Sequence, residues 1–215
     1  MDIQRSISIL FVGGIELSLL LSLPAAAALL IASEEITSAL FGYGSFNQTS
    51  VKNSAFALYF FSFGLPAFAL IKVFSSYIFA RQNTKTPFIF SIYSVVINIS
   101  LSIYYFDDLG FIIIPIATTI SSWVNALMLF IFITKKKYFE FENYFILSIF
   151  KIILNSTISA FIFYQMINFF NDFLVYESQY KLVTIILLVI ITFIFYILFS
   201  IITKAFKISD ITLRY

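Results

Sequence analysis

Long apolar runs, each broken by a short polar or turn-rich stretch, dominate the sequence. A helix needs about 20 apolar residues to cross the hydrocarbon core of a bilayer. Six runs are long enough, and we place them near Ile7–Ala32, Ser54–Ala80, Phe88–Phe106, Phe111–Thr134, Tyr144–Phe170 and Leu182–Phe206. The pattern therefore predicts an all-α integral membrane protein with about six transmembrane helices.

The break between the second and third runs is the most informative one. Residues 64–87 pass from an apolar helix with a proline (Pro66) and a lone lysine (Lys72) into a polar elbow at residues 81–87. A lysine at that depth costs roughly 2.5–3.5 kcal/mol on insertion scales. Two interpretations stay open: Lys72 faces a polar cavity, or its long side chain reaches the interface.

Other polar residues interrupt the spans. Pro24 removes a backbone hydrogen bond from the first span and predicts a kink there. Glu16 lies in the same span, either as a functional acid or as a residue that reaches the interface. In the third span, Asn98 has Ser94 and Ser102 four residues to either side, which puts all three on one helical face.

Composition agrees with a membrane protein, because 61% of the 215 residues are hydrophobic and only 11% are charged. The net charge of +2 says little, so the placement of the charges matters more. With the N-terminus inside, the inner side would carry Arg5, Arg81, Lys85, Lys135, Lys136, Lys137, Lys204, Lys207 and Arg214, and the outer side Lys52 and Lys181. This asymmetry predicts that both termini are cytoplasmic.

Several function classes are disfavoured. Cysteine and histidine are absent, which excludes disulfides, thiol catalysis and histidine-ligated metal sites. The adjacent acids Glu34-Glu35 and Asp107-Asp108 fall at predicted outer turns without histidine, so an intramembrane enzyme is a weak alternative. Glu34-Glu35 also opens a short amphipathic stretch that we expect to be an interfacial turn or helix. No basic, aromatic-interleaved face suggests nucleic-acid binding.

Three motifs in order carry a resemblance to a known family. They are ELSLLLSLPAAAALL followed by LFGYGSF, then LPAFALIKVFSSYIFARQNTKTP, then IPIATTISSWVNALMLF. They resemble the lipid II flippases of the MurJ/MviN family, within the multidrug/oligosaccharidyl-lipid/polysaccharide exporter superfamily. The resemblance implies helices 9–14 of a fourteen-helix flippase, its C-terminal portion. Residues 1–134 would be a four-helix part of the C-terminal lobe, 135–143 a basic and aromatic cytoplasmic loop, and 144–215 two additional helices.

The resemblance implies a transporter rather than an enzyme. Such a flippase moves undecaprenyl-pyrophosphate-linked peptidoglycan precursor across the bacterial inner membrane by alternating access. This chain would be incomplete alone, with membrane lipids, the lipid-linked precursor and a separate N-terminal lobe as its partners. The alternatives are another lipid-linked polysaccharide exporter, or a non-transporting membrane scaffold or gene fragment.

The resemblance also implies candidate sites. By position, Lys72, Arg81 and Lys85 are similar to basic residues that contact substrate or gate the cavity. Asn98, Ser102, the Ile114 carbonyl and Thr118 correspond to a sodium site in some members. Ser102 stands where those members have a carboxylate, so a sodium ion would be weakly held. No other cofactor and no other metal site are expected.

Overall fold

The computed structural model describes residues 3–136, 138 and 143–205. In those residues, six helices have 22 residues or more: α1 (Ile3–Ile31), α3 (Gln48–Ala80), α4 (Lys85–Leu109), α5 (Ile113–Lys135), α6 (Asn143–Phe169) and α8 (Lys181–Ile202). Three shorter elements connect them: α2 (Ser33–Phe41), η1 (Gly110–Ile112) and α7 (Asn171–Leu174). Each predicted span is thus found as one long helix, and the prediction of an all-α fold is confirmed.

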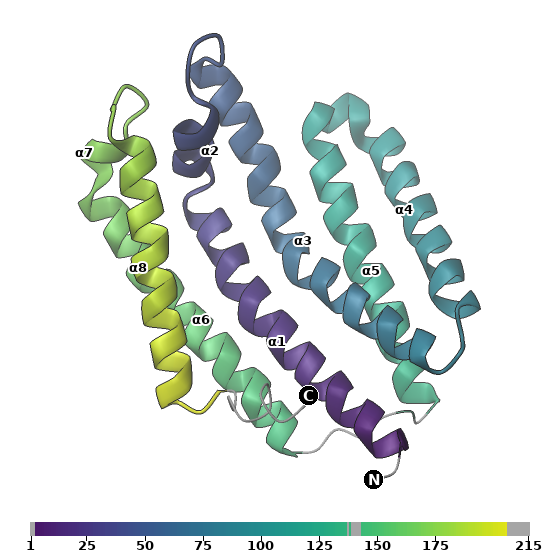
Figure 1. Cartoon of the computed structure of the whole chain (residues 1–215). Coiled ribbons are helices and arrows are strands. Elements are labelled where there is room, and N and C mark those ends of the chain that lie inside the picture. The colour runs from purple at the N-terminus through teal and green to yellow at the C-terminus, as the bar shows by residue number, and fades with distance from the viewer. Residues whose placement is uncertain (1–2, 137, 139–142, 206–215) are drawn as a thin grey trace.

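Five helical stretches of the described chain are long and apolar enough to cross a membrane, and one of them is 51 residues long, Lys85–Lys135. As a straight helix it would measure about 77 Å, more than twice the hydrocarbon thickness. The chain instead reverses at Gly110, whose φ of +59° is a conformation that favours glycine. Helices α4 and α5 therefore form a hairpin (Figure 1), so the described residues make six passes.

The six long helices form a single curved row (Figure 1). Along the row, the neighbours follow the order α8, α6, α1, α3, α5 and α4. The short helix α2 packs on α3 and α8 at the end of the molecule where α7 also lies. A row of this kind has two broad faces, and the helices at its two ends carry exposed apolar side chains, such as Ile103 of α4 and Ile202 of α8.

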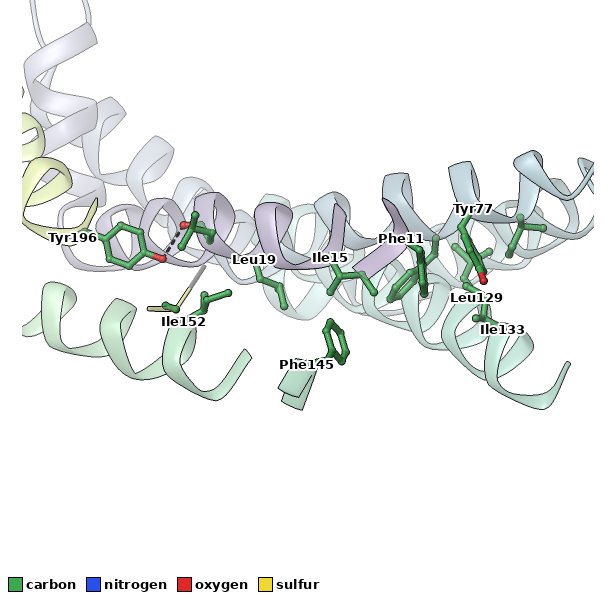
Figure 2. Packing of buried hydrophobic residues seen from close by; sticks show 13 residues of the cluster. Phe11, Ile15, Leu19, Tyr77, Leu129, Ile133, Phe145, Ile152 and Tyr196 are labelled. Atoms are coloured by element: carbon green, nitrogen blue, oxygen red, sulfur yellow. Dashed lines mark hydrogen bonds between the residues drawn. The ribbon is translucent and has the colours of Figure 1, made fainter. Parts of the chain in front are cut away.

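The largest buried cluster follows α1. Figure 2 shows Phe11, Ile15 and Leu19 of α1 together with residues of α3, α5, α6 and α8 from the same cluster. The neighbouring helices contribute Phe74, Tyr77, Ile78, Leu129, Ile133, Phe145, Ile152 and Tyr196, and Ala205 follows α8. A second cluster joins the end of α1 to α2, α6, α7 and α8. Helix α1 is thus the centre of the row's packing.

The proline of α1 is compensated by α8. Because Pro24 has no N–H, the carbonyl of Leu20, four residues earlier, lacks its helical donor. The Tyr196 hydroxyl donates to that carbonyl at 2.9 Å (Figure 2), and Tyr196 is fully buried. The Ser156 hydroxyl of α6 lies 3.5 Å from the Tyr196 hydroxyl, so one phenol links three helices. A freed carbonyl at membrane depth needs such a partner from a neighbouring helix.

Helix α3 bends in the middle (Figure 1), and Pro66 is the proline inside it. Two carbonyls in the preceding turns receive hydrogen bonds from α5. Thr119 Oγ1 donates to the Phe60 carbonyl at 2.8 Å, and Trp123 Nε1 donates to the Phe63 carbonyl at 2.9 Å. These bonds fix α5 against the bend.

Some predictions cannot be compared with the structure. Lys137, residues 139–142 of the predicted loop, Phe206 at the end of the sixth span, Lys207 and Arg214 lie outside the described residues, as does the side chain of Arg5. The division at residues 134 and 143 stays a prediction. The stretch expected to be an interfacial turn or helix contains α2.

Candidate functional site

Lys72 and Arg81 lie on opposite sides of α3. Nine residues separate them, which is 2.5 helical turns, or about 180° of rotation and about 14 Å along the axis. Arg81 is the C-cap residue of α3, whereas Lys72 lies inside the helix and is exposed. The two cations therefore point into different surroundings.

Arg81 is held by two tyrosines. Its Nη2 donates to the Tyr77 hydroxyl at 2.8 Å and to the Tyr138 carbonyl at 3.2 Å. The guanidinium carbon lies 4.9 Å from the Tyr77 ring centroid and 4.3 Å from that of Tyr138. The Tyr77 hydroxyl in turn donates to the Tyr138 carbonyl at 2.7 Å. This cluster, which we call the Arg81 clamp, ties the segment after α5 to the end of α3.

Lys72 lines a groove between α1 and α3. The groove has a volume of about 350 Å³ and is otherwise formed by Leu10, Phe11, Gly14, Val73, Ser76, Tyr77 and Ala80. Lys72 is the one charged residue among the described residues that line it. Tyr77 belongs both to this groove and to the Arg81 clamp, so the two features share a side chain.

Lys85 lines a different recess, at the elbow between α3 and α4. That recess has a volume of about 650 Å³ and also includes Ser75, Phe79, Thr84, Pro87, Phe88 and Ser91. The three basic candidates thus gather at one end of α3, but the structure places them in separate surroundings rather than in one pocket.

The structure brings three of the four candidate sodium ligands together. Asn98 of α4 donates an amide N–H to Thr118 Oγ1 of α5 at 3.0 Å, and Thr118 donates to the Ile114 carbonyl at 2.8 Å. The Asn98 amide also lies 3.4 Å from Ser121 Oγ. Ser102 is half-buried one turn further along α4.

These groups fit hydrogen bonding between helices better than they fit a cation. Sodium and other hard cations are held by oxygens, with carboxylates preferred. Asn98 instead presents its N–H to the Thr118 hydroxyl, and none of the four candidates carries a carboxylate. Within the described part of the chain, no three or more of His, Cys, Asp and Glu are grouped so that they could hold a metal. The contacts themselves explain how α4 and α5 stay paired.

Sequence reasoning missed the role of Lys181, which it used only as an outer-side charge. Its side chain is 2% exposed, and Nζ donates to the Gly42 carbonyl at 2.8 Å and to the Tyr176 carbonyl at 2.7 Å. The ammonium also lies 4.5 Å from the ring centroids of Tyr43 and Tyr176. We call this arrangement the Lys181 cage. The turn residues Gly42 and Tyr43 were visible in the sequence, but their partner lies far along the chain.

Comparison with known proteins identifies one family. Residues 4–184 match the family described as "Lipid II flippase MurJ". A "Probable lipid II flippase MurJ" from Rhizobium meliloti (strain 1021) is 46% identical over 116 residues, which cover 54% of this chain and 22% of the relative. The protein of that description from Thermotoga maritima is 32% identical over 199 residues, which cover 92% of this chain and 38% of the relative.

A solved structure has the same fold. It is described as "Lipid II flippase MurJ, inward closed conformation" and superposes with a TM-score of 0.72 at 23% sequence identity. The match covers 95% of this chain and 43% of the solved chain. The chain therefore spans less than half the length of these two relatives and of the solved flippase.

Proposed function

This chain belongs to the lipid II flippase MurJ family, and we propose that it forms part of a transporter for undecaprenyl-pyrophosphate-linked peptidoglycan precursor. It is a multi-pass membrane protein, and we place it in the bacterial inner membrane with both termini cytoplasmic, on the basis of its lysine and arginine distribution. Flipping a lipid headgroup makes and breaks no covalent bond, so the proposal contains no catalytic step.

The observation that carries the proposal is the single row of six membrane-length helices in a chain matched by this family. Alternating access needs two lobes that rock against each other around a shared cavity. One row of helices offers one face to lipid and the other to a second lobe. We propose that an N-terminal lobe, in the same polypeptide or encoded separately, faces this row.

Lys72 is the residue we assign to the headgroup. It is exposed and is the one charged residue among the described residues that line the apolar groove, so its ammonium can form charge-assisted hydrogen bonds with a phosphate. Arg81 has a different role, because its guanidinium is already engaged by Tyr77 and Tyr138. We propose that the Arg81 clamp makes α3 and the segment after α5 move as one body during rocking. Lys85 would attract the anionic headgroup to the cytoplasmic elbow.

The proposal is tested by complementation of flippase-depleted bacteria. The chain is co-expressed with the N-terminal lobe of a relative, and growth and precursor translocation are measured. Lys72→Gln should abolish rescue, whereas Lys52→Gln, on the exposed start of α3, should preserve it. Rescue by the chain without any second lobe, or full rescue by Lys72→Gln, would contradict the proposal.

Sodium coupling stays a prediction that rests on sequence correspondence alone. It predicts that transport by the assembled flippase slows when sodium is replaced by choline, and that Thr118→Val removes this dependence. Transport that is equal in both salts would leave Asn98 and Thr118 with the packing role that their contacts support.

A further inference from the structure

A polar pocket lies where α2, the start of α3 and α7 meet, at the opposite end of α3 from Arg81. It has a volume of about 160 Å³. The side chains that line it include five with oxygen atoms suited to a hard cation: Glu34, Glu35, Ser38, Gln48 and Asn171. None of these residues takes part in the groove of Lys72 or in the Asn98 cluster.

The local structure explains why these side chains gather. Glu34 and Glu35 stand in the first turn of α2, and Ser38 follows one turn later on the same face. Gln48 is the first residue of α3, directly after the N-cap Asn47, whose side chain accepts from the Ser50 N–H at 2.9 Å.

The Lys181 cage holds α7 and the residues that follow it, which form the remaining side of the pocket, against α2. Lys181 binds the carbonyls of Gly42, just after α2, and of Tyr176, just after α7. Tyr176 itself lines the pocket, and its hydroxyl donates to the Phe46 carbonyl at 2.9 Å. Asn171, in α7, is thereby brought up to the acids of α2.

Ser38 supplies a second and independent sign of a ligand. The residue is 4% exposed and lines the pocket, yet its buried Oγ has no hydrogen-bond partner among the described residues. Buried hydroxyls are nearly always satisfied, and an exception calls for a water or an ion.

The charges at the pocket also favour a bound cation. Glu34 and Glu35 are adjacent in the first turn of α2, and both line the pocket. Two adjacent carboxylates in such a place repel each other, and a bound cation would relieve that repulsion. The nearby cation Lys181 is already occupied by two carbonyls and two rings.

We propose that this pocket binds a hydrated divalent cation, Ca²⁺ or Mg²⁺, through the carboxylates of Glu34 and Glu35. The Ser38 hydroxyl and the amide oxygens of Gln48 and Asn171 complete the oxygen shell, together with water. Hard cations take six or more oxygens, and the volume accommodates an ion with several waters of about 30 Å³ each. An organic ammonium fits less well, because Tyr176 is the one aromatic side chain among the described lining residues and Lys181 already covers its ring.

The bound cation would join two parts of the chain. Helices α2 and α3 belong to the first half, whereas α7 leads into α8, so the ion would reinforce the Lys181 cage. Two carboxylates and neutral oxygens correspond to the weak class of calcium sites, with dissociation constants of about 10⁻⁴–10⁻³ M.

Calcium binding to the purified 215-residue chain tests the proposal directly. In detergent, at constant ionic strength, titration calorimetry should give one saturable site for Ca²⁺, and the melting temperature should rise with occupancy. The E34Q/E35Q variant should lose the binding and the temperature shift. Without Ca²⁺ it should be at least as stable as the parent, because it lacks the carboxylate repulsion, which separates a lost site from a misfolded chain. Ser38→Ala should weaken binding several-fold.

The matched control is D107N/D108N, which removes an adjacent acid pair exposed at the other extracytoplasmic turn. It should bind Ca²⁺ as the parent does. Binding that survives in E34Q/E35Q, equal losses in the two double variants, or the absence of a saturable site would overturn the proposal. Competition by ethanolamine as strong as that by Mg²⁺ would assign the pocket to a lipid ammonium and overturn it as well. The assay involves no transport, so it stands apart from the proposed flippase function.

Discussion

The hydroxyl of Tyr196 supplies the hydrogen bond that Pro24 withholds from the Leu20 carbonyl. The stability that this hydrogen bond contributes depends on the proline, because any other residue at position 24 would donate its own N–H to the same carbonyl. A side chain far away in the sequence thus replaces a backbone hydrogen bond that the proline removes.

We predict that Tyr196→Phe lowers the free energy of unfolding by about 1–2 kcal/mol, since it leaves a buried carbonyl unpaired. In a chain that also carries Pro24→Ala, Tyr196→Phe should lower the free energy of unfolding by clearly less. Unfolding by denaturing detergent, followed by circular dichroism, measures both. Equal costs in the two backgrounds would mean that the proline does not create the need for the phenol.

A pH dependence follows from Glu35, because burial and the neighbouring charge of Glu34 raise the pKa of its carboxyl. A carboxyl whose pKa is raised by folding favours the protonated form, so its ionised form weakens the fold above the raised pKa. The stability advantage of Glu35→Gln over the parent, measured without divalent cations, should therefore be present at neutral pH. It should shrink as the pH falls through the raised pKa towards 4.5, the ordinary value. An advantage that grows on acidification would contradict this assignment.

Single-residue roles were only partly predictable from the sequence. Pro24 and Lys72 stand out because each is costly in a membrane helix. Tyr196 and Lys181 do not, since a tyrosine in an apolar run and a lysine at the start of a helix are both ordinary. Their partners lie 176 and 139 positions away, at Leu20 and Gly42, and no periodic pattern connects such distances.

At the level of elements, the Lys181 cage fixes the turn before α8 against the turn after α2. Lys181→Met keeps the bulk of the side chain but leaves the Gly42 and Tyr176 carbonyls without their donor. We expect a loss of about 2–4 kcal/mol in the free energy of unfolding. Lys52→Met, an exposed lysine on α3, is the matched control and should change stability by less than about 0.5 kcal/mol. Thermal unfolding in detergent compares the two, and similar losses would argue against the cage.

Element boundaries followed the hydropathy pattern closely because bilayer thickness sets the length of an apolar run. The largest deviation at an N-terminus is at α3, which begins at Gln48 rather than at Ser54. Its first turns are polar and were therefore not counted as part of the run. The Asn47 side chain caps them by accepting from the Ser50 N–H. Capping preferences would have indicated this helix start, whereas hydropathy does not.

For the molecule as a whole, the orientation in the membrane can be tested cleanly because the sequence has no cysteine. Single cysteines at exposed Thr84, in the α3–α4 elbow, and at exposed Asp107, in the last turn of α4, lie at opposite ends of α4. With both termini inside, a membrane-impermeant thiol reagent should label Asp107→Cys in intact spheroplasts and Thr84→Cys only after lysis. The reverse pattern would invert the proposed topology.

The number of passes was predictable from the sequence, but the arrangement of the helices in one row was not. Packing between apolar helices depends on side-chain fit rather than on a strong pattern of polarity. For the same reason, the sequence placed Lys72 and Arg81 in one functional group, whereas half a turn's difference in phase directs them to opposite sides of α3.

The link between Tyr196 and Leu20 also bears on biogenesis. A ribosome adds about 5–20 residues per second, so roughly 9–35 s pass between the synthesis of these two positions, which are 176 residues apart. During that interval α3 and α6, the main neighbours of α1, are made, but the permanent donor to the Leu20 carbonyl does not yet exist. A nascent chain arrested before α8 should therefore keep α1 packed between α3 and α6 while its Leu20 carbonyl stays unpaired, and the synthesis of α8 would supply the missing hydrogen-bond donor.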